Sequence, residues 1–80
     1  MITKLNVISK AYTGNTTLPA AVNRGYFFIV MTSGTATIEL GQGGGTIPLI
    51  ADAFFEPYVA PIGEITITSA GTYTILTNSH

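Results

Sequence analysis

The side chains that could do chemistry are few and widely spaced in this chain of 80 residues. Asp52 and Glu56 are four positions apart, so a helical turn would place both carboxylates on one face. Such a pair could act as general acid and base, or bind a cation. No histidine, cysteine or third carboxylate lies near them in the sequence, and solvated or capping carboxylates are therefore the simpler interpretation.

Nucleophilic and metal chemistry lack their usual partners. A serine or threonine nucleophile needs an orienting base within hydrogen-bond reach. The single histidine, His80, is the last residue, where we expect the chain to fray. The absence of cysteine excludes disulfides and thiolate ligands, and one histidine leaves almost no nitrogen ligands. We therefore predict a protein that is not an enzyme and has no catalytic residue, cofactor or metal site.

Phosphate recognition is not indicated either. The glycine-rich stretch at 41–45 lacks the Lys-Ser/Thr pair of a P-loop and does not fit the dinucleotide fingerprint, so we interpret it as a flexible connector. The chain has three Lys/Arg against four Asp/Glu, a net charge of −1, and no basic run. Because nucleic-acid binding depends mainly on phosphate contacts, we expect no nucleic-acid partner.

Membrane insertion is not expected. The longest apolar run, residues 26–31, is far shorter than the roughly 20 residues of a membrane-spanning helix. The N-terminus lacks the continuous hydrophobic segment of a signal peptide. We expect the chain to be made and to fold in a cytosol.

Aromatic residues concentrate in one stretch, at Phe54, Phe55 and Tyr58, with Pro57 and Pro61 beside them. Exposed rings of this kind could stack on sugar rings, as in a carbohydrate-binding module. Aromatic residues are also enriched where protein subunits dock. We favour a core or subunit-interface role for Phe54, Phe55 and Tyr58, with glycan binding as the alternative.

The stretch 64–77 has the period of a half-buried β-hairpin. Isoleucine and tyrosine alternate there with threonine, and Gly71 stands where a three-residue turn needs a glycine. This turn predicts a register in which all apolar side chains share one face: Ile67 opposite Tyr73, and Ile65 opposite Ile75.

A second hairpin is predicted over 26–40, with Gly34 in the same turn position. Its inward face is expected to carry Phe28, Val30, Ala36 and Ile38. Three apolar residues then remain on the opposite face: Phe27, Ile29 and Met31. A strand that is apolar on both faces must be covered. We predict that a second subunit contacts this face, with cover by the N-terminal segment as the alternative.

Composition also favours association. Hydrophobic residues make up 46% of the chain and charged residues 9%, against about 25% charged in ordinary soluble domains. So short a chain has a small core, and small domains often need disulfides, a metal or a partner subunit. Because the sequence has no cysteine and a single histidine, disulfides and a metal site are not expected. Oligomerisation is therefore the expected means of stabilisation.

The predicted fold is an all-β single domain over 1–80. It is expected to be a small antiparallel β-sandwich or jelly-roll-like barrel built around the two hairpins. Strands near 2–9 and 47–60 would complete it, and 11–23 would form a long loop. Residues 1–10 could instead serve as an extended arm.

The two turn regions, 32–40 and 65–76, resemble each other and also a known family. Ser33-Gly34-Thr35-Ala36-Thr37-Ile38 is similar to Ala70-Gly71-Thr72-Tyr73-Thr74-Ile75, a weak internal repeat. Short, cysteine-free, charge-poor β chains with such turns resemble the capsid decoration (cement) and head-associated proteins of tailed bacteriophages. The resemblance implies a homotrimeric structural protein of the virion, made in the host cytoplasm and bound to a major capsid protein. The alternative is a small carbohydrate-binding module.

Overall fold

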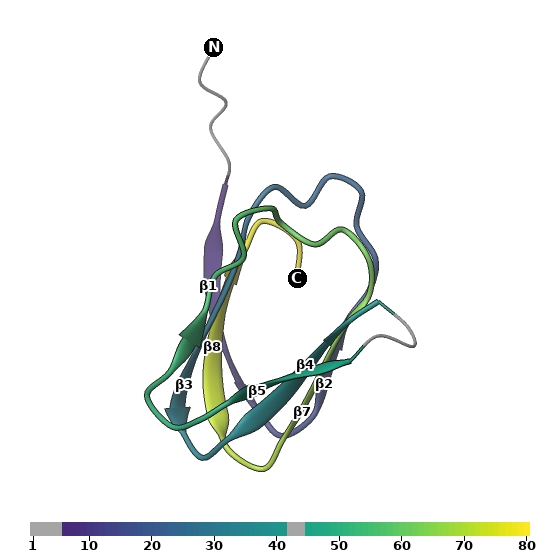
Figure 1. Cartoon of the computed structure of the whole chain (residues 1–80). Helices are drawn as coiled ribbons and strands as arrows, with labels where there is room; N and C mark the ends of the chain where they lie inside the picture. The colour runs from purple at the N-terminus through teal and green to yellow at the C-terminus, as the bar shows by residue number, and fades with distance from the viewer. Residues whose placement is uncertain (1–5, 42–44) are drawn as a thin grey trace.

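The computed structural model describes residues 6–41 and 45–80, which form two antiparallel sheets packed face to face (Figure 1). One sheet has the order β1-β8-β3-β6 and the other β2-β7-β4-β5. The strands are β1 (Ile8–Thr13), β2 (Thr16–Leu18), β3 (Phe27–Ser33), β4 (Ala36–Leu40), β5 (Thr46–Leu49), β6 (Phe54–Phe55), β7 (Ile65–Ser69) and β8 (Thr72–Thr77). This is the strand order of a jelly roll, so the predicted fold class is confirmed. In the described part of the chain, no helix is long and apolar enough to cross a membrane.

The pairing predicted for the two hairpins is wrong. β3 and β4 lie in different sheets, and so do β7 and β8. β3 pairs instead with β8, and β4 with β7, so that Ile29 lies opposite Ile75 and Ile38 opposite Ile67. The physical reason is that an isolated two-stranded hairpin buries too little surface to be stable. Exchanging partners gives β3, β4, β7 and β8 two strand neighbours each and encloses one core between the sheets.

The inward and outward faces predicted for β3 are also the wrong way round. Phe27, Ile29 and Met31 point into the core, and Ile29 is 0% exposed. They belong to the same buried cluster as Ile38 and Ile67 of the opposite sheet. The prediction that Phe27, Ile29 and Met31 contact another subunit is therefore wrong, and the second sheet rather than the N-terminal segment covers them. Phe28 and Val30, predicted to point inward, are only half-buried.

The inward positions predicted for β4, β7 and β8 are confirmed. Ala36 and Ile38 are buried on β4. The four apolar residues of the C-terminal stretch are also buried: Ile65, Ile67, Tyr73 and Ile75. The alternation in 64–77 therefore identified the correct face although it predicted the wrong strand partner.

The N-terminal part contains more strand than predicted. β1 and β2 occupy much of the predicted loop over 11–23, because Gly14, in the left-handed region at φ 80°, allows a tight turn between them. Of the predicted first strand over 2–9, Ile8 and Ser9 belong to β1, residues 6–7 are not in a strand, and 2–5 lie outside the described residues. Of the predicted arm, 8–10 belong to β1, and 1–5 lie outside the described residues.

The segment from β5 to the residues after β6 also differs from the prediction. β5 ends at Leu49, and a turn closed by the Ala53 amide on the Ile50 carbonyl at 3.1 Å follows it. Asp52 occupies the left-handed position of that turn, with φ 65°. No helical turn forms over 52–56, because Phe54 and Phe55 add to the edge of β3 as β6. Of the predicted strand region 47–60, the residues after β6, 56–60, form a loop.

Candidate functional site

Two long connections meet at one end of the sandwich, which we call the loop end. It comprises the β2–β3 connection at 19–26, the β6–β7 connection at 56–64 and the residues after β8, and Figure 1 shows them together at the top. The Ala21 amide donates to the Ile62 carbonyl at 2.8 Å. The Gly25 amide donates to the side-chain oxygen of Asn78 at 2.9 Å. These bonds join segments that are far apart in the sequence.

The buried side chain of Arg24 joins the two connections of the loop end by hydrogen bonds, an arrangement that we call the Arg24 lock. Its side chain is 3% exposed and donates from Nη1 to the carbonyls of Pro61 at 2.8 Å and Gly63 at 3.0 Å. Nη2 donates to the carbonyl of Pro19 at 2.7 Å, while Nε has no partner. Its partners are neutral carbonyls, and burial lowers the pKa of the guanidinium. The planar group stays charged and satisfies three carbonyls at once, which fixes both connections to each other.

Arg24 was not identified by the sequence reasoning. A signal existed, because it is the one charge between Lys10 and Glu39. An isolated charge in a polar loop is normally a solvated surface residue, however, so only the fold reveals that this one is buried.

An open pocket of about 330 Å³ lies beside this lock. Its lining comes from the end of the β2–β3 connection, the first residue of β3 and the β6–β7 connection: Gly25, Tyr26, Phe27, Glu56, Pro57, Tyr58 and Ala60. The Tyr26 hydroxyl donates a hydrogen bond to the Glu56 carboxylate. That bond, with smaller contributions from burial and from the charge of Glu56, raises the pKa of Tyr26. The pocket therefore offers two phenol rings and one carboxylate that is already hydrogen-bonded.

The structure does not bring Asp52 and Glu56 together as a catalytic pair. Asp52 lies in the turn before β6, and Glu56 follows β6, so extended backbone separates them. Glu56 lines the pocket, whereas Asp52 is not among the lining residues. The described lining includes no imidazole, thiol or amine that could work with Glu56. The arrangement is suited to holding a ligand against aromatic faces.

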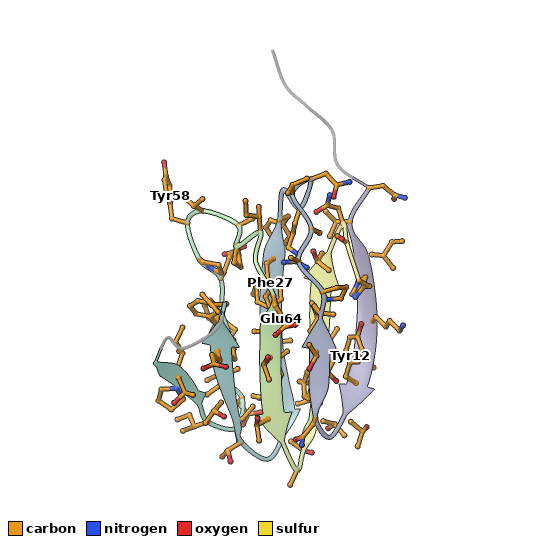
Figure 2. The ribbon with its side chains drawn as sticks, turned by 90° about the vertical axis from the view of Figure 1, so that its right-hand side faces the viewer. Tyr12, Phe27, Tyr58 and Glu64 are labelled. Atoms are coloured by element: carbon orange, nitrogen blue, oxygen red, sulfur yellow. The ribbon has the colours of Figure 1, made fainter. Side chains whose placement is uncertain are left out.

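The aromatic stretch is divided among three environments. Phe54 is exposed on the outer face of its sheet, where it stacks on Phe28 with ring centroids 5.6 Å apart. Phe55 is half-buried against the core. Tyr58 is fully exposed and projects from the loop end (Figure 2). A single continuous aromatic patch therefore does not form, and the interface role predicted for these three residues stays a prediction.

Exposed aliphatic side chains accompany Tyr58 at the loop end. Val22 is 87% exposed and Val59 74% exposed, and Ile62 is also exposed. They come from both connections that Arg24 joins. Large apolar groups held in water on ordered loops are typical of a surface that contacts a partner.

The C-terminus is ordered, contrary to expectation. The His80 ring contacts the Tyr12 hydroxyl through Nδ1 at 2.9 Å and the Ile8 carbonyl through Nε2 at 2.7 Å. Tyr12 in turn stacks on Tyr73. Both ring nitrogens of His80 are thus occupied by β1. Among the described residues, no group of three or more His, Cys, Asp or Glu is placed to hold a metal ion.

No family model and no curated protein matches this sequence. Among solved structures, the chain is similar to an RmlC-like cupin protein from Desulfovibrio desulfuricans, with 23% identity and a TM-score of 0.58. The match covers 89% of this chain and 67% of the cupin chain. At this identity the similarity shows the fold. The chain is thus a small jelly roll, an architecture that viral capsid domains, lectin domains and cupins share.

The interior of this jelly roll is a packed apolar core. Its members come from both sheets: Leu18, Phe27, Ile29, Met31, Ala36, Ile38, Leu49, Ile65, Ile67, Tyr73 and Ile75. Nearly all of these side chains lack metal-ligating atoms, and the space between the sheets is filled by them. The features that can recognise another molecule therefore lie on the outside, at the loop end and along the sheet edges.

Proposed function

We propose that this chain is a non-enzymatic subunit that docks on a larger protein assembly through its loop end. The specific form that we favour is a capsid decoration protein, bound to the major capsid protein on the outside of a phage particle. The observation that carries the proposal is the exposure of Val22, Tyr58 and Val59 on loops that Arg24 ties together.

Preorganisation makes these side chains suitable for docking. A loop that is already ordered loses less conformational entropy on binding than a mobile one. Each fully buried valine or larger apolar side chain contributes about 1.5–3 kcal/mol. One subunit could therefore bind only weakly, but subunits joined in the proposed trimer at the capsid surface would engage several sites at once and bind with avidity.

The proposal differs from the sequence-based one in its contact surface. Phe27, Ile29 and Met31 are core residues, so they play no part in docking. Val22, Val59 and Ile62 replace them, together with Tyr58 from the original set. Location in the virion, and the homotrimer at the capsid surface that the resemblance implies, belong to the proposal. They are supported by the low charge content of 9% and by the jelly-roll architecture that capsid domains use.

Co-sedimentation tests the docking role. The chain would be mixed with empty shells assembled from the major capsid protein of the virus that carries its gene, and then pelleted. We expect saturable binding that Val59→Asp weakens at least tenfold. Thr35→Asp, at an exposed position in the β3–β4 connection at the opposite end of the sandwich, is the matched control. Absence of saturable binding by the unaltered chain would exclude the decoration role.

Glycan binding is the second candidate, and the pocket beside Tyr58 is the observation that favours it. A sugar ring could stack on an exposed phenol while Glu56 accepts hydrogen bonds from its hydroxyls. Titration with glucose, galactose, mannose and N-acetylglucosamine, followed by amide NMR shifts, tests this role. Shifts confined to 25–27 and 56–60, and lost in Tyr58→Ala, would support it. A spectrum unchanged at 50-fold excess of each sugar would argue against it.

A further inference from the structure

The four sheet edges of this sandwich are unequal. Three are short or interrupted: β2 has three residues, β6 has two, and β5 contains Pro48. Short edge strands and edge prolines prevent pairing with other chains. β1 has six residues, Ile8–Thr13, with no proline, and all except Tyr12 are exposed. Figure 2 shows the strand of Tyr12 at the rim of the molecule. β1 is therefore the edge on which another strand could add.

The hydrogen bonds to β8 determine which backbone groups of β1 remain free. The Gly14 amide donates to the Gly71 carbonyl at 3.1 Å, so position 14 faces β8. Backbone groups alternate in direction along an antiparallel strand, and the even-numbered residues of β1 therefore face β8. The odd-numbered residues Ser9, Ala11 and Thr13 present their N–H and C=O groups outward.

We propose that β1 pairs antiparallel with β1 of a second copy, about a two-fold axis at Ala11. In this register Ala11 lies opposite Ala11 of the second copy, and Ser9 lies opposite Thr13. All three outward residues of each strand then exchange hydrogen bonds, about six in total. The two sheets that contain β1 would join into one continuous sheet across the dimer.

The charge of Lys10 favours this register over the adjacent one, in which the two-fold axis passes through Lys10. Moving the axis to Lys10 would place two lysines directly opposite each other at the close, non-hydrogen-bonded spacing, which is destabilising. With the axis at Ala11, Lys10 instead lies opposite Tyr12 of the second copy. Lys10 already lies over the ring of its own Tyr12, 5.4 Å from the centroid, so this pairing brings together groups that attract each other.

A second copy is the occupant that the strand itself specifies. The same six residues supply the donors, acceptors and side-chain pairs on both sides, which is the self-complementarity of a two-fold interface. This inference does not rest on the docking role of the loop end. It also predicts a two-fold dimer contact, whereas the decoration-protein resemblance implies a trimer. The contact is small, so we expect dimerisation to depend strongly on concentration.

Cysteine crosslinking tests the register, because the natural chain has no cysteine. Opposed hydrogen-bonded residues have Cα atoms about 5.5 Å apart, within the range of about 4.4–6.8 Å that disulfides need. Under mild oxidation we expect Ala11→Cys to form disulfide-linked dimers at least tenfold faster than Thr17→Cys on β2. The double variant Ser9→Cys/Thr13→Cys should also crosslink between chains. Each single variant of that pair should not, since its two copies would lie roughly 14 Å apart at about 3.4 Å per residue.

Proline provides the second test. Ala11→Pro removes an outward N–H and leaves the bonds to β8 in place, so the fold should persist. Light scattering of the natural chain should show a mass that rises from 8.4 kDa toward twice that value with concentration. The rise should vanish in Ala11→Pro, with circular dichroism unchanged. A mass that stays at 8.4 kDa up to millimolar concentration, with Ala11→Cys no faster than Thr17→Cys, would overturn the proposal.

Discussion

Gly34 and Gly71 meet backbone to backbone at the end opposite the loop end. A Cβ added to Gly34 would lie 2.9 Å from the Cα of Gly71, which is closer than real Cβ contacts come. Gly34 also has φ +76°. A Cβ added to Gly71 would overlap the carbonyl oxygen of Ser33. At this point the β3–β4 and β7–β8 connections pass from one sheet to the other, so their contact fixes how the two sheets are placed relative to each other.

The first prediction is that Gly71→Ala destabilises the protein by more than about 3 kcal/mol, because its neighbour is rigid backbone rather than a flexible side chain. Gly14→Ala, with φ +80° but open space around it, should cost only about 1–2 kcal/mol of backbone strain. Gly45→Ala meets nothing within 4 Å and should be nearly neutral. Urea unfolding of the three variants checks the order. Equal losses for Gly71→Ala and Gly14→Ala would contradict a steric role.

The second prediction concerns the lock formed by Arg24. Arg24→Met should cost about 2–4 kcal/mol, since it leaves three carbonyls without donors. Arg24→Lys should recover only part of the loss, because one ammonium cannot reproduce the planar fork. Hydrogen exchange should quicken at 19–26 and 56–64 before it changes in β8. Lys10→Met, at an exposed position, is the control and should alter neither quantity.

The third prediction separates the two faces of β3. Ile29→Ala should cost about 2–5 kcal/mol, because Ile29 is 0% exposed in the core. Val30→Ala, next along the strand and half-buried, should cost about 1 kcal/mol. Chemical denaturation at two protein concentrations measures both. A loss for Ile29→Ala that grew on dilution would indicate a subunit contact instead of a core position.

The fourth prediction is a loss of stability at alkaline pH. Burial raises the pKa of Tyr73, against a smaller lowering by its hydrogen bond with Thr16, and burial with the charge of Tyr73 raises that of Tyr12. The fold thus holds these protons more tightly than the unfolded chain does. Stability should be complete below pH of about 10, the ordinary pKa of tyrosine. It should fall as the pH rises from there through the raised pKa of the folded state.

Tyr73→Phe tests this assignment. The variant should lose about 1–2 kcal/mol at neutral pH, because the hydroxyl donates to the Gly14 carbonyl at 2.6 Å and contacts Thr16 Oγ1 at 2.7 Å. Its alkaline loss of stability should be smaller than that of the natural chain. Tyr58→Phe, at an exposed ring, is the control. An alkaline profile of Tyr73→Phe parallel to that of the natural chain would show that other groups cause the loss.

The internal repeat has a structural counterpart. Exchanging the half β1–β4 with the half β5–β8 maps each strand pairing onto another: β3·β8 onto β7·β4, and β1·β8 onto β5·β4. The similar segments 33–38 and 70–75 occupy equivalent places in the two halves, each a sheet crossing followed by a strand. Ile38 and Ile75 are correspondingly both fully buried.

Local patterns in the sequence were sufficient for the fold class and for much of the core. Period-two alternation depends only on backbone geometry, so it identified Ile65, Ile67, Tyr73 and Ile75 as one buried set. The glycines of the two predicted turns do lie in the connections between strands, Gly34 at 34–35 and Gly71 at 70–71. Only Gly34 has the expected left-handed conformation; Gly71 is needed instead because the Ser33 carbonyl approaches it closely. Tyr58 was predicted to lie in the core or at a subunit interface, with glycan binding as the alternative, and its full exposure excludes the core position.

Strand partners and buried charge were decided only by the tertiary structure. A glycine turn can close a hairpin or carry the chain across to the other sheet, and the same residues serve either path. On β3 both rows of side chains are apolar, so alternation alone could not show that Ile29 rather than Val30 points inward. Arg24 became a lock only because 56–64 brings two carbonyls to it from a distant part of the chain. Each of these outcomes depends on contacts between residues far apart in sequence, which no local pattern contains.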